Sequence, residues 1–208
     1  MAAASTHSGR HDSNRSSLRD RLRDATADAH ARLDVQLDRL DLARLADYRD
    51  FLDLSASALL PLEAALVGAG VERIFADWPL RARSRAILDD LERVGGNPHP
   101  LASPGCVGLA DVLGAMYVLE GSRLGAKVLA RRASSSADPV VAGATAYLRH
   151  GAGLHLWPSF LAILERHRTA LHDDDAVIAA ARRGFALFAA AAARLDAGRQ
   201  LPRASVPA

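Results

Sequence analysis

Apolar residues recur at every third or fourth position along most of this chain, which is the spacing that places them on one face of an α-helix. Leucine, alanine, arginine and aspartate dominate the sequence, whereas the β-branched and aromatic residues that favour strands are sparse. The pattern predicts an all-α protein of about seven helices joined by short connections. No internal repeat interrupts it, so one compact domain is expected.

The start and stop signals give approximate bounds for these helices. Ser16 or Ser17 is the expected N-cap of the first one, Pro61 is expected to kink the second, and the pair Gly95-Gly96 ends the third. The expected helices span residues 17–34, 42–67, 80–94, 109–132, 139–150, 157–171 and 174–195. The predicted domain covers residues 17–196, between a disordered tail at 1–16 and a flexible tail at 197–208.

Composition narrows the class of protein. The 208 residues are 50% hydrophobic, which is enough to build one sizeable core. The chain has 26 Lys and Arg residues and 24 Asp and Glu residues, and no run of basic residues dominates, so nucleic acid is not an expected partner. The single cysteine, Cys106, cannot form an internal disulfide. The polar N-terminal 16 residues and the lack of a long apolar run predict a cytoplasmic protein that does not bind membranes.

The segment 109–132 carries three glycines in the interior of a predicted helix. Gly114, Gly121 and Gly125 share one stripe with four larger residues on the expected buried face, namely Leu113, Tyr117, Leu124 and Val128. Each interior glycine costs a helix about 1 kcal/mol relative to alanine, so the bare backbone should serve a purpose. Two purposes remain open: close packing of another helix, or close approach of a flat ligand.

Histidine 30 lies at the edge of the apolar face of the first helix. A single histidine in such a place is more often exposed or satisfied by a neighbour than a ligand. Arg23 lies seven residues earlier on the same stripe, however, so a ligand bound by His30 could have an anionic group that meets a guanidinium. Asp173-Asp174-Asp175 stands where a helix begins, and capping explains it better than cation binding.

Several common catalytic motifs are missing from the sequence. No HExxH or ExxH pattern places histidines at metal-binding spacing, so a di-metal site made of protein ligands alone is not expected. The chain has neither a GxSxG nucleophile turn nor a GxxxxGK[ST] phosphate loop, and no GxGxxG opens a helix after a strand.

Two segments together resemble a known family. The stretch from Leu22 to Asp34, LRDATADAHARLD, resembles the proximal helix of haem oxygenases, and the stretch from Tyr117 to Ala126, YVLEGSRLGA, resembles their distal helix in its bacterial form. The two occur in the family's order, about 90 residues apart, on an all-α chain of suitable length. The resemblance covers roughly residues 18–195 and implies a haem oxygenase-like multihelical fold.

The resemblance also implies roles for particular residues. His30 would be the axial ligand of the haem iron, and Gly121 and Gly125 the points where the distal helix comes close to the macrocycle, since only residues without Cβ allow that approach. Arg23 would lie near the haem propionates, and Tyr117 in the pocket wall. Many members of the family carry an aspartate just after the first distal glycine, where this chain has Ser122.

A second departure from the family pattern is Ala126, which replaces the second of two adjacent glycines. Without the distal aspartate, backbone carbonyls, other side chains and ordered water must hold the proton-delivering network. Gly121, Ser122 and Gly125 are therefore the expected catalytic positions.

The activity implied is cleavage of haem by O2 and external electrons to biliverdin, carbon monoxide and ferrous iron. A ferredoxin or another reductase would supply the electrons, and a bilin-binding photoreceptor is a possible user of the biliverdin. Two alternatives remain: a haem carrier or sensor that does not degrade haem, and a helical interaction protein of the same fold without haem.

Overall fold

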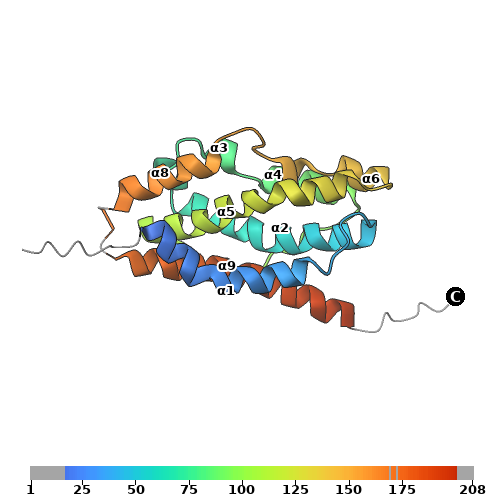
Figure 1. The fold of residues 1–208 in the computed structure, drawn as a ribbon, viewed down its shortest axis with the longest axis horizontal. Helices are drawn as coiled ribbons and strands as arrows, with labels where there is room; N and C mark the ends of the chain where they lie inside the picture. Colours follow the sequence, from blue (N-terminus) through green and yellow to red (C-terminus); the bar gives the residue numbers. More distant parts are fainter. Residues whose placement is uncertain (1–16, 169, 172, 201–208) are drawn as a thin grey trace, which may run out of the picture.

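The structure is a computed structural model that describes residues 17–168, 170–171 and 173–200. All regular secondary structure in this part of the chain is helical, as the apolar spacing predicts (Figure 1). The α-helices are α1 (Leu18–Leu37), α2 (Leu45–Gly68), α3 (Trp78–Arg81), α4 (Ser84–Arg93), α5 (Gly108–Ser134), α6 (Pro139–Gly143), α7 (Ala146–Arg149), α8 (Leu156–Arg168) and α9 (Asp174–Gln200), and a 3-10 turn, η1, covers Val71–Arg73.

Each of the seven predicted segments contains helix, but the segment 80–94 is divided into α3 and α4. Ala82 is extended, with φ −62° and ψ 131°, and ends α3. The carboxylate of Glu63, on α2, then accepts the backbone N–H groups of Arg83 at 2.8 Å and of Ser84 at 2.9 Å. This carboxylate thereby satisfies free donors at the start of α4 and stabilises the break.

The segment 139–150 is divided in the same way, into α6 and α7. The hydroxyl of Tyr48 donates to the carbonyl of Ala144 between them. The buried carboxylate of Asp90 accepts the N–H groups of Ala146 at 3.1 Å and Tyr147 at 2.8 Å, at the start of α7. Burial raises the pKa of Asp90, and the two N–H bonds oppose that shift.

The structure confirms a predicted cap at the start of the first helix and corrects the predicted end of the last helix. Ser17 caps α1, its hydroxyl accepting the N–H of Asp20, which confirms one of the two expected caps. The expected end of the last helix at residue 195 is wrong, because α9 continues to Gln200; the flexibility of residues 197–208 stays a prediction. There Arg199 binds Asp47 and Asp50 of α2, and these ion pairs help to hold the last turn of α9 in place. The predicted tail at 1–16 and residues 201–208 lie outside the described residues.

Helix α9 packs against both α1 and α5, and Figure 1 shows it running alongside α1. A Cβ added to Gly114 of α5 would lie 2.5 Å from the Cβ of Ala180 on α9, so the two backbones are in close contact there. Gly184 of α9 fits against Val118 of α5, and Phe185 lies on the other side against His30 of α1, with ring centroids 5.9 Å apart. One short stretch of α9 therefore brings the middle of α1 and the middle of α5 to the same part of the molecule.

Two helices, α2 and α9, are long and apolar enough to cross a membrane by length and composition alone. Of their most apolar stretches, 67% and 50% of the residues are buried inside the fold, as in core helices of soluble proteins.

Candidate functional site

The glycine stripe of α5 divides into two halves with different surroundings. Gly114 is in close contact with α9 and the neighbouring Leu113 is buried, so close packing explains the first glycine. Leu124 and Val128 are 62% and 58% exposed, and the prediction that they belong to the buried face is wrong. The core covers the N-terminal half of the stripe and leaves its C-terminal half open.

Gly121 and Gly125 have no packing reason to lack a side chain. A Cβ at Gly121 would make only ordinary contact with the ring of Trp157, at 3.7 Å, and a Cβ at Gly125 would meet nothing within 4 Å. These two glycines and the exposed side chains of Leu124 and Val128 form an apolar strip with accessible backbone on α5. A flat apolar ligand could lie against this strip with large burial of apolar surface.

His30 is exposed on α1, with 60% of its side chain accessible. Its Nδ1 lies 2.8 Å from the carboxylate of Asp34, one turn later. A hydrogen bond from Nδ1–H to this carboxylate leaves the lone pair on Nε2, and metal-binding histidines commonly have such a carboxylate partner. Among the described residues no group of three or more His, Cys, Asp and Glu side chains could hold a metal ion.

Tyr117 lies where α1 and α5 come together. It is half-buried against Trp157 and Phe160, with ring centroids 5.8 and 6.5 Å away. Burial raises the pKa of Tyr117, while the hydroxyl of Thr26 on α1 and the charges of Arg23 and Arg19 act to lower it. In the view of Figure 1, α1 and α5 diverge beyond this region toward their C-terminal ends.

Arg23 is 63% exposed and lies close enough to Tyr117 to influence its pKa. Its guanidinium pairs with Asp20 at 3.1 Å and with Asp24 at 3.2 Å, both on α1. Exposed ion pairs of this kind contribute about 1 kcal/mol or less, so a ligand carboxylate can replace them.

Ser122 lies between the two glycines, but its hydroxyl already forms two hydrogen bonds within the fold. It donates to the carbonyl of Leu119 at 2.8 Å and accepts from the guanidinium of Arg83 at 3.1 Å. Arg83 is 2% exposed, also donates to the Leu119 carbonyl at 3.0 Å, and lies over the ring of Tyr147 at 5.2 Å. Ser122 can therefore accept one more hydrogen bond, for example from water, but its own proton is in use.

A buried charge network supports the same part of α5 from behind. The carboxylate of Glu120, 1% exposed, lies 3.2 Å from the guanidinium of Arg81 and 3.1 Å from that of Arg123. Arg123 also donates to Nδ1 of His150 at 3.3 Å. Burial, followed by the charges of Arg123 and Arg83, lowers the pKa of His150 to about 4, so this histidine is neutral at pH 7.

Neither this network nor the contact of Arg83 with Ser122 was predicted from the sequence. Only the spacing of Glu120 and Arg123, three residues apart, signals an ion pair in advance. Arg81 belongs to α3, Arg83 to the link before α4, and His150 follows the end of α7. No local sequence pattern predicts that these residues meet at α5.

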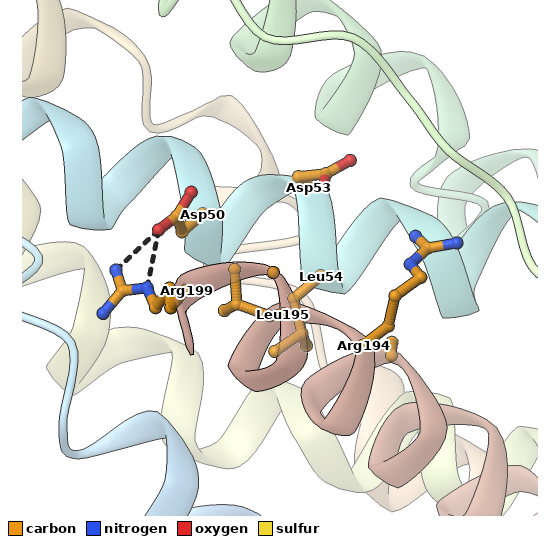
Figure 2. A pocket seen from close by; sticks show the side chains of 8 residues that line it. Asp50, Asp53, Leu54, Arg194, Leu195 and Arg199 are labelled. Atoms are coloured by element: carbon orange, nitrogen blue, oxygen red, sulfur yellow. Dashed lines mark hydrogen bonds and ion pairs between the residues drawn. The ribbon is translucent and has the colours of Figure 1, made fainter. Parts of the chain in front are cut away.

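A separate surface groove of about 700 Å³ lies between α2 and α9 (Figure 2). Asp50 and Asp53 line it from α2, and Arg194 and Arg199 from α9. Arg199 binds Asp50, while Arg194 donates to Ser57 and to the carbonyl of His99. These charged groups already have partners, and none of the predicted site residues lines this groove.

Comparison with known proteins bears on the fold. No family model matches the chain, and no curated protein sequence does. Among solved structures, the chain is similar to a haem oxygenase from Neisseria meningitidis, studied with NO and CO bound, at a TM-score of 0.60 and 18% identity. The match covers 92% of this chain and 100% of that one. The chain therefore has the fold of a haem oxygenase.

Proposed function

We propose that this protein is a biliverdin-producing haem oxygenase that binds haem between α1 and α5. The observation that carries the proposal is the strip of Gly121, Leu124, Gly125 and Val128, which lies open on a helix whose residues 112–120 are largely buried. Exposed apolar side chains beside bare helical backbone are costly for a soluble protein unless a ligand covers them.

The residues present fit a haem. His30 would hold the haem iron through Nε2, and Asp34 orients the imidazole through Nδ1. Gly121 and Gly125 admit the macrocycle and a small gas molecule close to the backbone of α5.

The charged edge of the substrate also has candidate partners. Arg23 is an exposed cation near the junction of α1 and α5, and Tyr117 lies in the wall there with its phenol near Thr26. Both suit the propionate carboxylates of haem, one by charge and the other by hydrogen bonding.

When bound, haem supplies the iron that activates O2 and the meso carbon that is oxidised, with electrons from a separate donor. The chain itself excludes bulk water with Leu124 and Val128 and supplies a water position at Ser122. Because the hydroxyl of Ser122 donates to Leu119, the proton must come from water held there or at backbone carbonyls rather than from the serine.

The engaged hydroxyl of Ser122 also supports the second candidate, a haem carrier or sensor. A distal pocket that cannot hold its proton-delivering water would bind haem without degrading it. The two functions differ in turnover rather than in binding.

A haemin titration of the purified protein, followed by turnover with ascorbate and analysis of the products, tests the proposal. We expect a saturable Soret band and then its loss, with biliverdin, carbon monoxide and ferrous iron as products. A stable Soret band under reductant would assign the carrier function instead. Absence of any saturable band would leave only the helical interaction protein.

The hydrogen bond between Asp34 and His30 gives a more specific prediction. Replacing Asp34 by Asn should weaken haemin binding about 10-fold, because loss of an outer carboxylate partner typically costs 10–100-fold in metal affinity and this pair is exposed. The melting temperature of the haem-free protein should hardly change, since exposed pairs contribute little. Asp28→Asn, an exposed change on the same helix, is the matched control; equal affinities for the two variants would contradict the prediction.

A further inference from the structure

The stretch of α5 that carries the open strip is weakly packed. Between Glu120 and Ala130 no residue of α5 is buried, and Ala126 and Leu129 are only partly buried against the core. The two glycines of the strip weaken the helix further, because glycine disfavours helical backbone. Apolar packing therefore does little to fix the position of this part of α5.

Arg123 ties the weakly packed stretch to two other parts of the chain. Its side chain is only 11% exposed. Nη2 donates to the carbonyl of Arg81, the last residue of α3, and Nη1 donates to the carbonyl of His150 at 3.1 Å, directly after α7. Carbonyls at the C-terminal end of a helix lack partners within that helix. One guanidinium therefore joins α5 to the ends of two short helices.

Other hydrogen bonds of Arg123 use the rest of its planar fork. Nη1 also lies 3.3 Å from Nδ1 of His150, which can accept a hydrogen bond because this imidazole is neutral at pH 7. Nε donates to the carboxylate of Glu120 at 3.1 Å, and Arg81 shares that carboxylate at 3.2 Å. Lysine has a single nitrogen and could not reach all of these acceptors together. The arrangement therefore depends on the shape of arginine as well as on its charge.

The surroundings leave the guanidinium little freedom to move. A Cβ added to Gly151 would lie 3.3 Å from Nη1 of Arg123 and 2.6 Å from the side chain of Leu156. In the view of Figure 1, α3 and α8 lie on one side of α5, whereas α1 and α9 lie on the other. Arg123 therefore holds α5 from the side away from α1, the helix that carries His30.

The burial of several charges at this point argues for a role in geometry. A buried ion pair adds little net stability, because both charges lose their hydration, and its best-attested use is to fix the relative placement of the elements that it joins. Here the elements joined are α3, the link after α7, and the one stretch of α5 whose backbone is open to a ligand.

We propose that Arg123 is a positioning residue that fixes the backbone of α5 at Gly121 and Gly125 over the haem site and thereby orients a small ligand on the iron. The inference rests on the proposed function, in which this backbone faces the distal side of haem. In this role Arg123 touches neither substrate nor O2 and acts through the helix that it holds. Loss of its hydrogen bonds should leave haem bound at His30 but allow α5 more than one arrangement.

Hydrogen exchange of the haem-free protein tests the anchoring without any ligand. Arg123→Lys, which keeps the charge, should increase exchange at residues 121–129 about 10-fold or more, because hydrogen bonds to charged groups are among the stronger ones. Residues 112–119 should exchange as in the wild type. The matched control is Arg132→Lys, the same substitution near the end of α5, where the guanidinium donates to the carbonyl of Leu40. Unchanged exchange at 121–129 in Arg123→Lys would overturn the proposal.

The infrared spectrum of the ferrous carbon monoxide complex tests the orientation. We expect one narrow C–O stretching band for the wild type and for Arg132→Lys, and a broadened or split band for Arg123→Lys. Turnover with ascorbate should fall about 10-fold in Arg123→Lys, whereas haemin affinity should change by less than about 2-fold. A wild-type band, undiminished turnover, or a fall in haemin affinity as large as the fall in turnover would overturn the positioning role.

A second variant keeps the test decisive if Arg123→Lys does not fold. Removing one partner of a buried ion pair leaves an unpaired charge, whereas removing both is often nearly neutral. Glu120→Gln/Arg123→Gln removes both, and Arg81 keeps its two hydrogen bonds to the carboxylate of Asp77. This double variant should show the same faster exchange and the same broadened band, and wild-type behaviour in it would overturn the proposal.

The outcomes also separate this inference from the proposed function. If the wild type binds haemin but forms no biliverdin, the proposed function fails, and the C–O band still decides whether Arg123 positions α5 over the haem. If the wild type binds no haemin, the proposed function and this role of Arg123 both fail, whatever the exchange of residues 121–129.

Discussion

Replacing His30 by alanine is expected to weaken haemin binding about 100-fold or more, equivalent to about 2.8 kcal/mol. The imidazole is exposed, and its contacts in the described chain are Asp34 and the ring of Phe185. Its loss should therefore leave the fold intact while removing the one axial ligand that we propose. Spectrophotometric titration measures the affinity, and the ferric spectrum should lose the signature of a bound imidazole.

The control for this variant is His155→Ala, which removes an exposed histidine near the start of α8. It should bind haemin as the wild type does. Added imidazole should restore the spectral signature of the His30 variant, because truncation leaves space beside Phe185 for the free base. An unchanged ferric spectrum for His30→Ala would show that another residue is the axial ligand.

The helices of this fold were predictable because their apolar spacing is regular, but the breaks within them were not. Segments 80–94 and 139–150 each read as one helix by periodicity alone. The carboxylates of Glu63 and Asp90, which belong to other helices, satisfy the backbone at the starts of α4 and α7. Since a distant carboxylate determines each break, the local sequence contains no signal for it.

The candidate site shows a similar limit. Periodicity correctly placed Gly114, Gly121, Leu124 and Val128 on one stripe of α5, yet it does not say how far along the helix the neighbouring elements extend. The structure supplies that information: the neighbours cover the stripe around Gly114 and leave it open around Leu124 and Val128. Close packing of another helix therefore explains Gly114, whereas close approach of a ligand stays a prediction for Gly121 and Gly125.

The same division predicts opposite effects for two identical substitutions in α5. Gly114→Ala should lower the free energy of unfolding by about 2 kcal/mol, since its Cβ would lie 2.5 Å from the Cβ of Ala180 and 2.7 Å from the backbone nitrogen of Ala181. The melting temperature should fall by about 4–8 °C. Calorimetry of the haem-free protein measures this change, and an unaltered melting temperature would contradict the close packing of α5 on α9.

Gly125→Ala should instead raise the free energy of unfolding by about 1 kcal/mol, because alanine favours the helix and its Cβ meets nothing within 4 Å. In the proposed complex the same methyl group would occupy space needed for haem and O2, so turnover to biliverdin should fall about 10-fold although the protein is more stable. Gain of stability with loss of turnover is the combination expected if α5 lacks side chains there for a ligand. A Gly125→Ala protein that is both more stable and fully active would show that this glycine does not face the substrate.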